Sequence, residues 1–188
     1  MGRRRSDRGG RVMEQRGAEI EVRAKGRRLE GHAALFGVET RISGPRGLFR
    51  ETIRAGAFAA SLRSRDVLAL RDHDPKRVLA RTKSGTLRLA EDSTGLQFAL
   101  DLADTSEARD VLAMVERGDA GGMSFAFDAE DENWQGDRRE LRSVVLHEIS
   151  VVSAWPAYPG TVVQARAGGP AAPSGLALAR LYLDTLRS

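Results

Sequence analysis

The sequence predicts an α+β protein that is mainly β, with an antiparallel β-barrel core surrounded by a few helices. Short apolar stretches separated by turn residues fill most of the chain, and few segments show helical periodicity. The chain has 188 residues, of which 41% are hydrophobic and 30% charged, so we expect one folded domain with appendages. The same composition excludes a wholly disordered or fibrous chain.

The expected strands are short apolar runs between clusters of glycine, proline, serine and aspartate. They are residues 19–22, 28–36, 49–53, 67–70, 86–89, 96–102, 122–128 and 141–153. The turns that punctuate them are expected at residues 44–45, 83–85, 92–95 and 135–137. The sequence has no fixed repeat period.

One helix is well specified by its ends and its apolar spacing. Asp104 is expected to cap it, Glu107 stands at the capping-box position, and Gly118 ends it. Its apolar face follows the i, i+3, i+4, i+7 spacing, with Ala108, Val111, Leu112 and Val115. A second, shorter helix is expected at residues 56–62.

Both ends of the chain are expected to lie outside the folded domain, which we place at residues 18–166. Residues 1–17 are rich in arginine and glycine and are expected to form a disordered basic arm. Residues 167–175 have the Gly/Pro/Ala composition of a linker. Residues 176–188 carry leucines among helix formers and predict a short C-terminal helix, which either docks on the domain or engages a partner protein.

Composition excludes several classes of function. The chain has no cysteine, which excludes disulfides, thiolate catalysis and zinc or iron–sulfur sites built on cysteine. The net charge of +4 comes from the first eleven residues, where five arginines face one aspartate, and the rest of the chain is neutral. Because the rest of the chain has no excess of positive charge to attract phosphate groups, nucleic acid is not expected as a partner. No apolar stretch reaches the roughly 18 residues that span a bilayer, so no membrane partner is expected.

Histidines that could act as a base near neutral pH are few, because the chain has only His32, His73 and His147. His73 follows the expected strand 67–70, and the ends of strands are where scaffolds present functional side chains. The simpler interpretation is a partly exposed surface histidine between two aspartates.

Ser124 lies in the expected strand 122–128, on the face opposite the apolar side chains of Met123, Phe125 and Phe127. Gly121 and Gly122 stand just before Met123 and Ser124, and they leave backbone N–H groups that could meet a developing oxyanion. The pattern leaves two interpretations open, a structural serine or a nucleophile.

His147 and Glu148 lie in the middle of the expected strand 141–153, which is apolar on both faces. A buried carboxylate needs a partner, so we expect a cation, an imidazole or several donors beside Glu148. An arginine would make a structural pair, whereas a histidine would be oriented by the carboxylate. Neighbouring side chains of a regular strand point to opposite faces, so His147 and Glu148 share one site only if the strand is bulged.

Several motifs occur in a fixed order along residues 19–166. They are Phe49-Arg50-Glu51-Thr52-Ile53 leading into Gly56-Ala57-Phe58, Asp72-His73-Asp74, Gly122-Met123-Ser124-Phe125-Ala126-Phe127, and Leu146-His147-Glu148-Ile149-Ser150-Val151-Val152 with Pro156-Ala157-Tyr158-Pro159. Their combination resembles the prohead (capsid-maturation) serine protease family of tailed phages.

The resemblance implies a herpesvirus-protease-like barrel and a serine endopeptidase. It assigns the nucleophile to Ser124, the general base to His73 and the third catalytic role to Glu148, with His147 as the alternative third member. Backbone N–H groups or an arginine, Arg138 or Arg139, are the candidate donors to the oxyanion.

The resemblance also implies where the protein acts and on what. The expected substrates are the scaffold protein and the major capsid protein, and self-cleavage is expected as well. We expect a homo-oligomer inside the immature phage head, in the cytoplasm of the bacterial host, with no cofactor and no metal.

Three other functions remain to be separated from this one. A non-catalytic head scaffold or assembly protein could keep the fold and use the C-terminal helix. A metal-dependent hydrolase could use the three histidines, although no His-x-x-x-His or Glu-x-x-His pair sets a ligand geometry. A nucleic-acid-binding module ranks last, because no basic and aromatic residues are interleaved.

Overall fold

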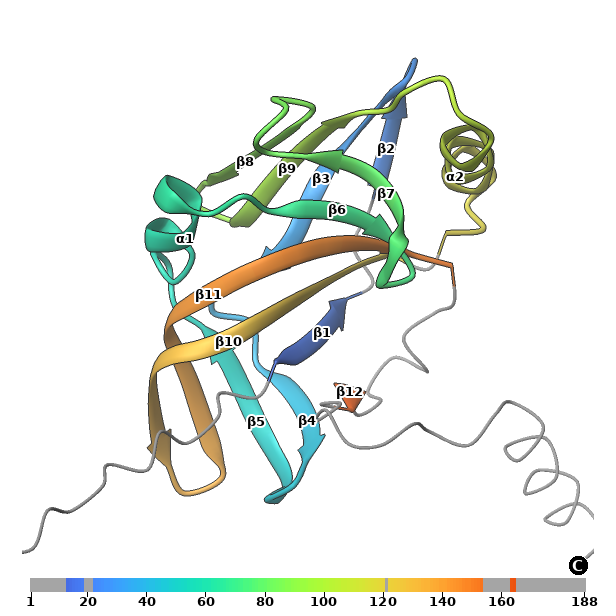
Figure 1. Ribbon diagram of the computed structural model, residues 1–188. Helices are drawn as coiled ribbons and strands as arrows, with labels where there is room; N and C mark the ends of the chain where they lie inside the picture. Colours follow the sequence, from blue (N-terminus) through green and yellow to red (C-terminus); the bar gives the residue numbers. More distant parts are fainter. Residues whose placement is uncertain (1–12, 19–21, 121, 154–162, 165–188) are drawn as a thin grey trace, which may run out of the picture.

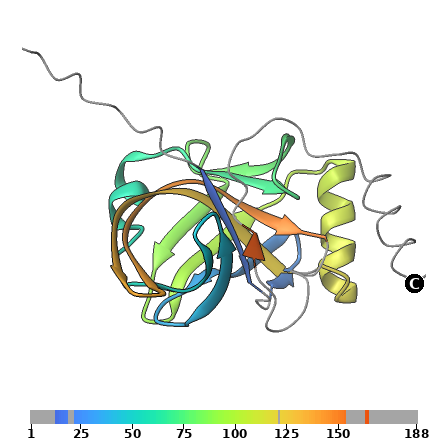
Figure 2. The same ribbon diagram turned by 90° about the horizontal axis from the view of Figure 1, so that it is seen from below.

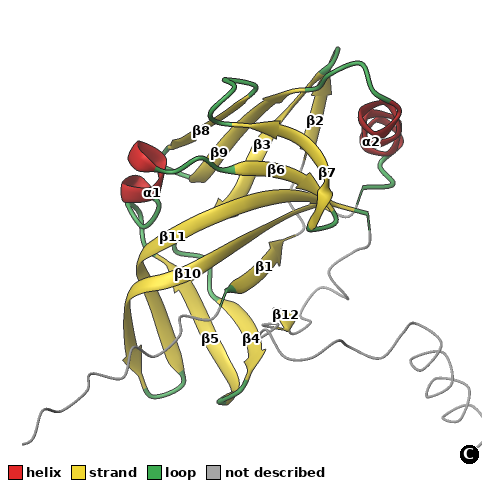
Figure 3. Ribbon diagram, viewed as in Figure 1, coloured by secondary structure: helices red, strands yellow, loops and turns green. Residues whose placement is uncertain are grey.

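The computed structural model describes residues 13–18, 22–120, 122–153 and 163–164. Within them the protein consists of two β-sheets and two helices, which lie at opposite ends of the molecule (Figures 1, 2 and 3). The prediction of a mainly β protein with few helices is confirmed. The predicted linker 167–175, the C-terminal helix 176–188 and residues 1–12 of the basic arm lie outside the described residues.

The larger sheet has eight strands. Six follow one another in the order β1 (Glu14–Ala18), β10 (Gly122–Gln135), β11 (Arg138–Val152), β5 (Gly47–Ile53), β4 (Thr40–Gly44) and β12 (Val163–Gln164). The other two are β6 (Leu68–Arg71), which pairs with β11, and β7 (Asp74–Arg81), which pairs with β6. The smaller sheet has the order β2 (Val22–Lys25), β3 (Arg28–Leu35), β9 (Gly95–Asp101) and β8 (Leu87–Glu91).

The edge of β11 that faces away from β10 is covered by three consecutive segments. Its start pairs with β5 and its end with β6, both in parallel. Between them lies α1 (Ala59–Ser64), where Val144 N donates to Ala57 O at 3.0 Å. The buried Ser61 hydroxyl donates to Val144 O at 2.8 Å and accepts from Leu146 N at 2.9 Å. The backbone of β11 is therefore satisfied across the gap between β5 and β6.

The expectation of an antiparallel barrel is corrected in one respect and not confirmed in another. β11 with β5, β11 with β6, and β12 with β4 are parallel pairs, so the larger sheet is mixed. β5 and β6 do not pair with each other: both run along the same edge of β11 in the same direction, and the segment containing α1 joins them. The described strands form two separate sheets, and they do not close into one barrel.

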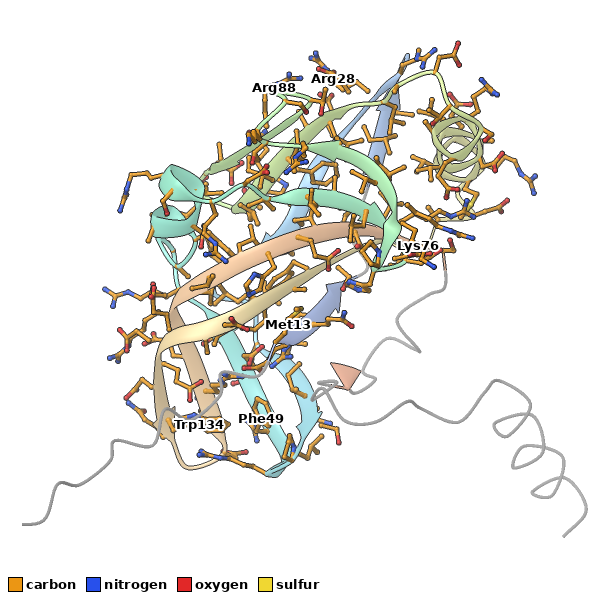
Figure 4. The ribbon with its side chains drawn as sticks, viewed as in Figure 1. Met13, Arg28, Phe49, Lys76, Arg88 and Trp134 are labelled. Atoms are coloured by element: carbon orange, nitrogen blue, oxygen red, sulfur yellow. The ribbon has the colours of Figure 1, made fainter. Side chains whose placement is uncertain are left out.

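Both sheets contribute to one hydrophobic core. Its largest fully buried side chains come from β3, β8 and β9 of the smaller sheet, from β10 and β11 of the larger sheet, and from the segment before α1; they include Leu29, Leu87, Phe98, Phe127, Ile149 and Phe58. At the far end of the larger sheet, Phe49 of β5 packs on Trp134 of β10 with ring centroids 5.0 Å apart (Figure 4).

The longer helix, α2 (Ser106–Arg117), forms where the sequence predicts it. Its N-cap is Thr105, whose hydroxyl accepts from Ala108 N at 3.2 Å, and not Asp104 as expected. Gly118 ends it in the left-handed conformation, with φ of 75°. Ala108 and Val111 bury the apolar face against the core.

Four strands form where the sequence does not predict them: β1, β4, β7 and the two-residue β12. β1 begins at Glu14, so residues 14–17 belong to the sheet and not to a disordered arm. β4 is short, and β7 carries mostly exposed side chains, so neither has a strong apolar pattern. β7 also contains Pro75, which has no backbone N–H to donate. An edge strand tolerates proline, and β7 is an edge strand because it pairs only with β6.

Candidate active site

A two-residue turn between β6 and β7 presents His73. Arg71 and Asp74 pair across the hairpin, and Asp72 and His73 between them have positive φ of 51° and 60°. Such a turn requires the left-handed conformation at both positions, which aspartate and histidine adopt more readily than most residues. The Asp72 carboxylate holds the turn by accepting from Ser153 N at 2.7 Å and from its hydroxyl at 2.8 Å.

The His73 side chain is hydrogen-bonded to Glu148. His73 Nδ1 lies 2.6 Å from Glu148 Oε1, and the other carboxylate oxygen accepts from the Ser150 hydroxyl at 2.6 Å. An ionised carboxylate only accepts hydrogen bonds, so the imidazole donates through Nδ1. In the neutral ring, Nε2 then carries the free lone pair that a general base needs.

A β-bulge in β11 turns His147 and Glu148 to the same face. Glu148 pairs with Ala126 of β10 and Leu146 pairs with Phe127, so His147 is an additional residue without a partner in the register. Leu146 and Ile149 both belong to the core, and the two side chains between them point away from it. We call this side of β10 and β11 the outer face.

His147 contacts other partners than the catalytic candidates. Its Nε2 lies 2.9 Å from Asp128 Oδ2, and its Nδ1 lies 3.4 Å from an Arg65 nitrogen. The imidazole that Glu148 binds is that of His73.

Ser124 lies on the outer face beside Ser150, its direct partner across β10 and β11. Opposed residues of an antiparallel pair point to the same side, with Cβ atoms roughly 4.5–5.5 Å apart. Ser124 is buried, and its hydroxyl donates to the Arg16 carbonyl of β1 at 2.7 Å. Within the described part of the chain, no hydrogen bond joins Ser124 to His73.

The sequence predicts roles for His73, Ser124 and Glu148 and for neither Ser150 nor Asp72. Ser150 accepts from His73 N at 3.3 Å, besides donating to Glu148. Alternation from Glu148 could have found it, because residues two apart on a strand share a face. No pattern in the sequence reveals that Asp72 binds Ser153, since the two residues are far apart in the chain.

Arg138 and Arg139, the arginines proposed as oxyanion donors, bind carboxylates instead. Arg139 is buried and donates to Glu132 at 2.7 Å, to Glu51 at 2.9 Å and to both oxygens of Glu14. Arg138 is exposed and lies 3.8 Å from Glu39. The guanidinium of Arg139 is therefore fully engaged in a buried ionic cluster.

The buried ionic cluster joins three strands. Arg16 of β1 donates to Glu51 of β5 at 2.6 Å and 2.9 Å, and Arg139 of β11 contacts the same carboxylate. Burial alone would raise the pKa of Glu14, but hydrogen bonds and positive charge from Arg139 and Arg16 outweigh it, so this pKa lies below its ordinary value of 4.5. The cluster links β1, β5 and β11, and it contains none of His73, Glu148 and Ser124.

The third histidine is remote from these groups in the fold. His32 of β3 in the smaller sheet lies 2.8 Å from Asp92, close to the end of β8. Among the described residues, no three histidine or carboxylate side chains gather in a way that could hold a metal ion. Within the same residues, no helix has the length and apolar character needed to cross a membrane.

Comparison with known proteins agrees with the sequence motifs. A family model described as the caudovirus prohead serine protease matches residues 16–171, which is most of the chain. No curated protein and no solved structure matches the chain. The matched range includes every residue of the His73, Glu148, Ser150 and Ser124 arrangement. The chain therefore belongs to the caudovirus prohead serine protease family.

Proposed function

We propose that the protein is a serine endopeptidase that cleaves the scaffold protein and the major capsid protein, and itself, inside the immature phage head. Family membership supports a serine protease of prohead maturation. The observation that carries the residue assignment is the 2.6 Å hydrogen bond between His73 Nδ1 and Glu148 Oε1, on the face that also bears Ser124.

The proposed roles follow from the direction of this hydrogen bond. Glu148 holds the proton of His73 on Nδ1, so Nε2 can take the proton of the Ser124 hydroxyl. The serine oxygen then attacks the peptide carbonyl, and Nε2 returns the proton to the leaving amine. Water hydrolyses the acyl-enzyme by the same route, with Nε2 accepting its proton. Glu148 stabilises the imidazolium that forms in each step.

In the resting arrangement, the Ser124 hydroxyl donates to the Arg16 carbonyl and not to His73. Rotation about χ1 of Ser124 is the movement that redirects the hydroxyl, and staggered rotamers make it a discrete change. Catalysis in this scheme requires the serine to leave the carbonyl of β1 before it transfers its proton.

The test is co-expression of the protein with the neighbouring head proteins, followed by intact mass measurement of every species. We expect cleavage products with the wild-type chain and none with Ser124→Ala, since removing the nucleophile of a serine protease costs about 10⁶-fold in kcat. Ser61→Ala is the matched control, because Ser61 is also a buried serine but contacts only backbone atoms of β11.

Two results would contradict the proposal. Identical products with wild type and Ser124→Ala would mean that Ser124 is not the nucleophile. Normal head assembly without cleavage of any head protein would favour the non-catalytic assembly protein that keeps the fold.

A further inference from the structure

We propose that Ser150 is a positioning residue of this site, which sets the orientation of Glu148 and thereby the tautomer of His73. The inference rests on the proposed function, because it assigns Ser150 a task in preparing His73 as the base. Ser150 is not given a catalytic role, since its hydroxyl contacts Glu148 and the His73 backbone and none of the atoms that react.

The contacts of Ser150 close a ring of hydrogen bonds. Its hydroxyl donates to Glu148 Oε2 at 2.6 Å and accepts from His73 N at 3.3 Å. Glu148 Oε1 in turn accepts from His73 Nδ1 at 2.6 Å. The carboxylate is therefore bound through both oxygens, while the backbone of His73 binds Ser150 and its ring binds Glu148.

Burial raises the energetic cost of losing these hydrogen bonds. Ser150 has no exposed surface, and Glu148 is 7% exposed. A buried carboxylate oxygen without a donor is costly, so the Ser150 hydroxyl fixes the torsion of the Glu148 side chain. The fixed torsion keeps Oε1 directed at Nδ1, which holds the proton on that nitrogen.

The position of Ser150 follows from the bulge in β11. Glu148 and Ser150 are two residues apart after the bulge and share the outer face. Across the sheet, Ser150 lies between Ser124 of β10 and Leu70 of β6 in the register. Leu70 is buried and directly precedes the Arg71–Asp74 hairpin that presents His73, so Ser150 sits between the strand of the nucleophile and the turn of the base.

Ser61 is a buried serine with a purely structural role, and it serves as the comparison for Ser150. Both serines are buried and each makes two hydrogen bonds, but Ser61 contacts only backbone groups, Val144 O and Leu146 N. Loss of either hydroxyl should lower stability by a similar amount, because each loss leaves buried partners unsatisfied. Only loss of the Ser150 hydroxyl should change the state of the His73 ring.

The experiment is ¹⁵N NMR of the imidazole nitrogens in the full chain at a pH where the rings are neutral. The chain has three histidines, and His73→Gln identifies the signals of His73. We expect the Nδ1–H tautomer of His73 to dominate in wild type and Ser61→Ala, and to lose its dominance in Ser150→Ala. Dominance of that tautomer in Ser150→Ala to the wild-type extent would overturn the proposal.

A second variant covers failure of Ser150→Ala to fold. Ser150→Cys has nearly the same volume and replaces a strong donor with a weak one. The proposal requires a measurable loss of the Nδ1–H tautomer in this variant, and an unchanged ring would overturn it. Because this readout needs no proteolysis, it stays interpretable if Ser124→Ala proves that the proposed function is wrong.

The same variants have an expected effect on processing. Ser150→Ala should lower kcat by about 10- to 100-fold with little change in KM, because the lost interaction acts on the base and not on the substrate. Ser61→Ala should remain within about 2-fold of wild type. If Ser124→Ala is inactive but Ser150→Ala cleaves at the wild-type rate, the positioning role of Ser150 is wrong and the proposed protease function still stands.

Discussion

At the scale of single residues, the turn that presents His73 is held in a conformation that costs energy. Asp72 and His73 both have positive φ, and each such residue costs roughly 1–3 kcal/mol relative to an ordinary conformation. Hydrogen bonds from outside the turn offset this cost: Asp72 N donates to Val151 O at 3.0 Å, and the Asp72 carboxylate binds Ser153. The position of the imidazole thus depends on a side chain that does no chemistry.

We expect Asp72→Ala to lower the free energy of unfolding by about 1–3 kcal/mol, because Ser153 N loses its acceptor and alanine tolerates positive φ less well. Asp72→Asn is the control, since asparagine favours this conformation and still offers an oxygen. Urea unfolding of the three chains measures the difference. Equal stability of the alanine variant and wild type would mean that the carboxylate does not hold the turn.

At the scale of elements, the bulge in β11 decides which side chains share the outer face. Alternation along residues 141–153 predicts that His147 and Glu148 point to opposite faces, and one additional residue removes that opposition. The sequence contains no direct signal for the bulge. Its indirect signal is the apolar pair Leu146 and Ile149, which are three residues apart and both buried.

Deleting His147 is expected to abolish cooperative folding. A regular strand would turn either Leu146 and Val144 or Ile149 and Val151 out of the core, and loss of each buried aliphatic side chain costs about 2–5 kcal/mol. His147→Ala is the control, because it keeps the bulge and removes only the contacts to Asp128 and Arg65. Circular dichroism during thermal unfolding distinguishes the two variants. A deleted chain that melts like wild type would disprove the role of the bulge.

Strand positions could be predicted from the sequence better than strand partners. The apolar runs around Phe98 and Ile149 give strands close to the expected ranges, and β10 begins where it is expected but continues to Gln135. β7 could not be predicted, because it is an edge strand with exposed side chains that is held mainly by pairing with β6. The parallel pairing of β11 with β5 and β6 depends on contacts made by α1, and no local pattern encodes them.

At the scale of the whole molecule, the buried ionic cluster ties β1 to β5 and β11. Arg16, Glu51 and Arg139 are each less than 7% exposed, and removing one partner would leave the others buried without compensation. The same strand that supplies Arg16 supplies the carbonyl that accepts from Ser124. The cluster therefore fixes β1 beside the candidate nucleophile, although it takes no part in the proposed chemistry.

The lowered pKa of Glu14 predicts how this cluster responds to acid. A carboxyl group whose pKa is lower in the folded chain stabilises the fold above its ordinary value of 4.5, and this contribution is lost as the pH falls through the lower folded value. We expect wild type to be more stable than Glu14→Gln at pH 7, and the difference to shrink steadily below about pH 4.5. Urea unfolding from pH 7 to pH 3 measures it, and a difference that grows with acid would contradict the assignment.

The sequence motifs predict which residues belong to the candidate site, but not the contacts between them. The family motifs contain His73, Ser124 and Glu148, and the structure adds the hydrogen bond between His73 and Glu148. The Arg16 carbonyl that binds Ser124 could not be predicted, because residues 1–17 have the composition of a disordered arm. Contacts between segments more than 100 residues apart depend on the register of the sheet, which composition does not reveal.

The shortness of the hairpin that carries the histidine limits how this enzyme could be switched on. A two-residue connection held by hydrogen bonds to Ser150 and Ser153 leaves its backbone little room to move, so the histidine cannot be carried toward or away from its target as it could on a long loop. The remaining freedom belongs to the serine, and it is governed by the first strand of the sheet. In the proposed mechanism, a displacement of this strand would release the hydroxyl and leave the turn of the histidine in place.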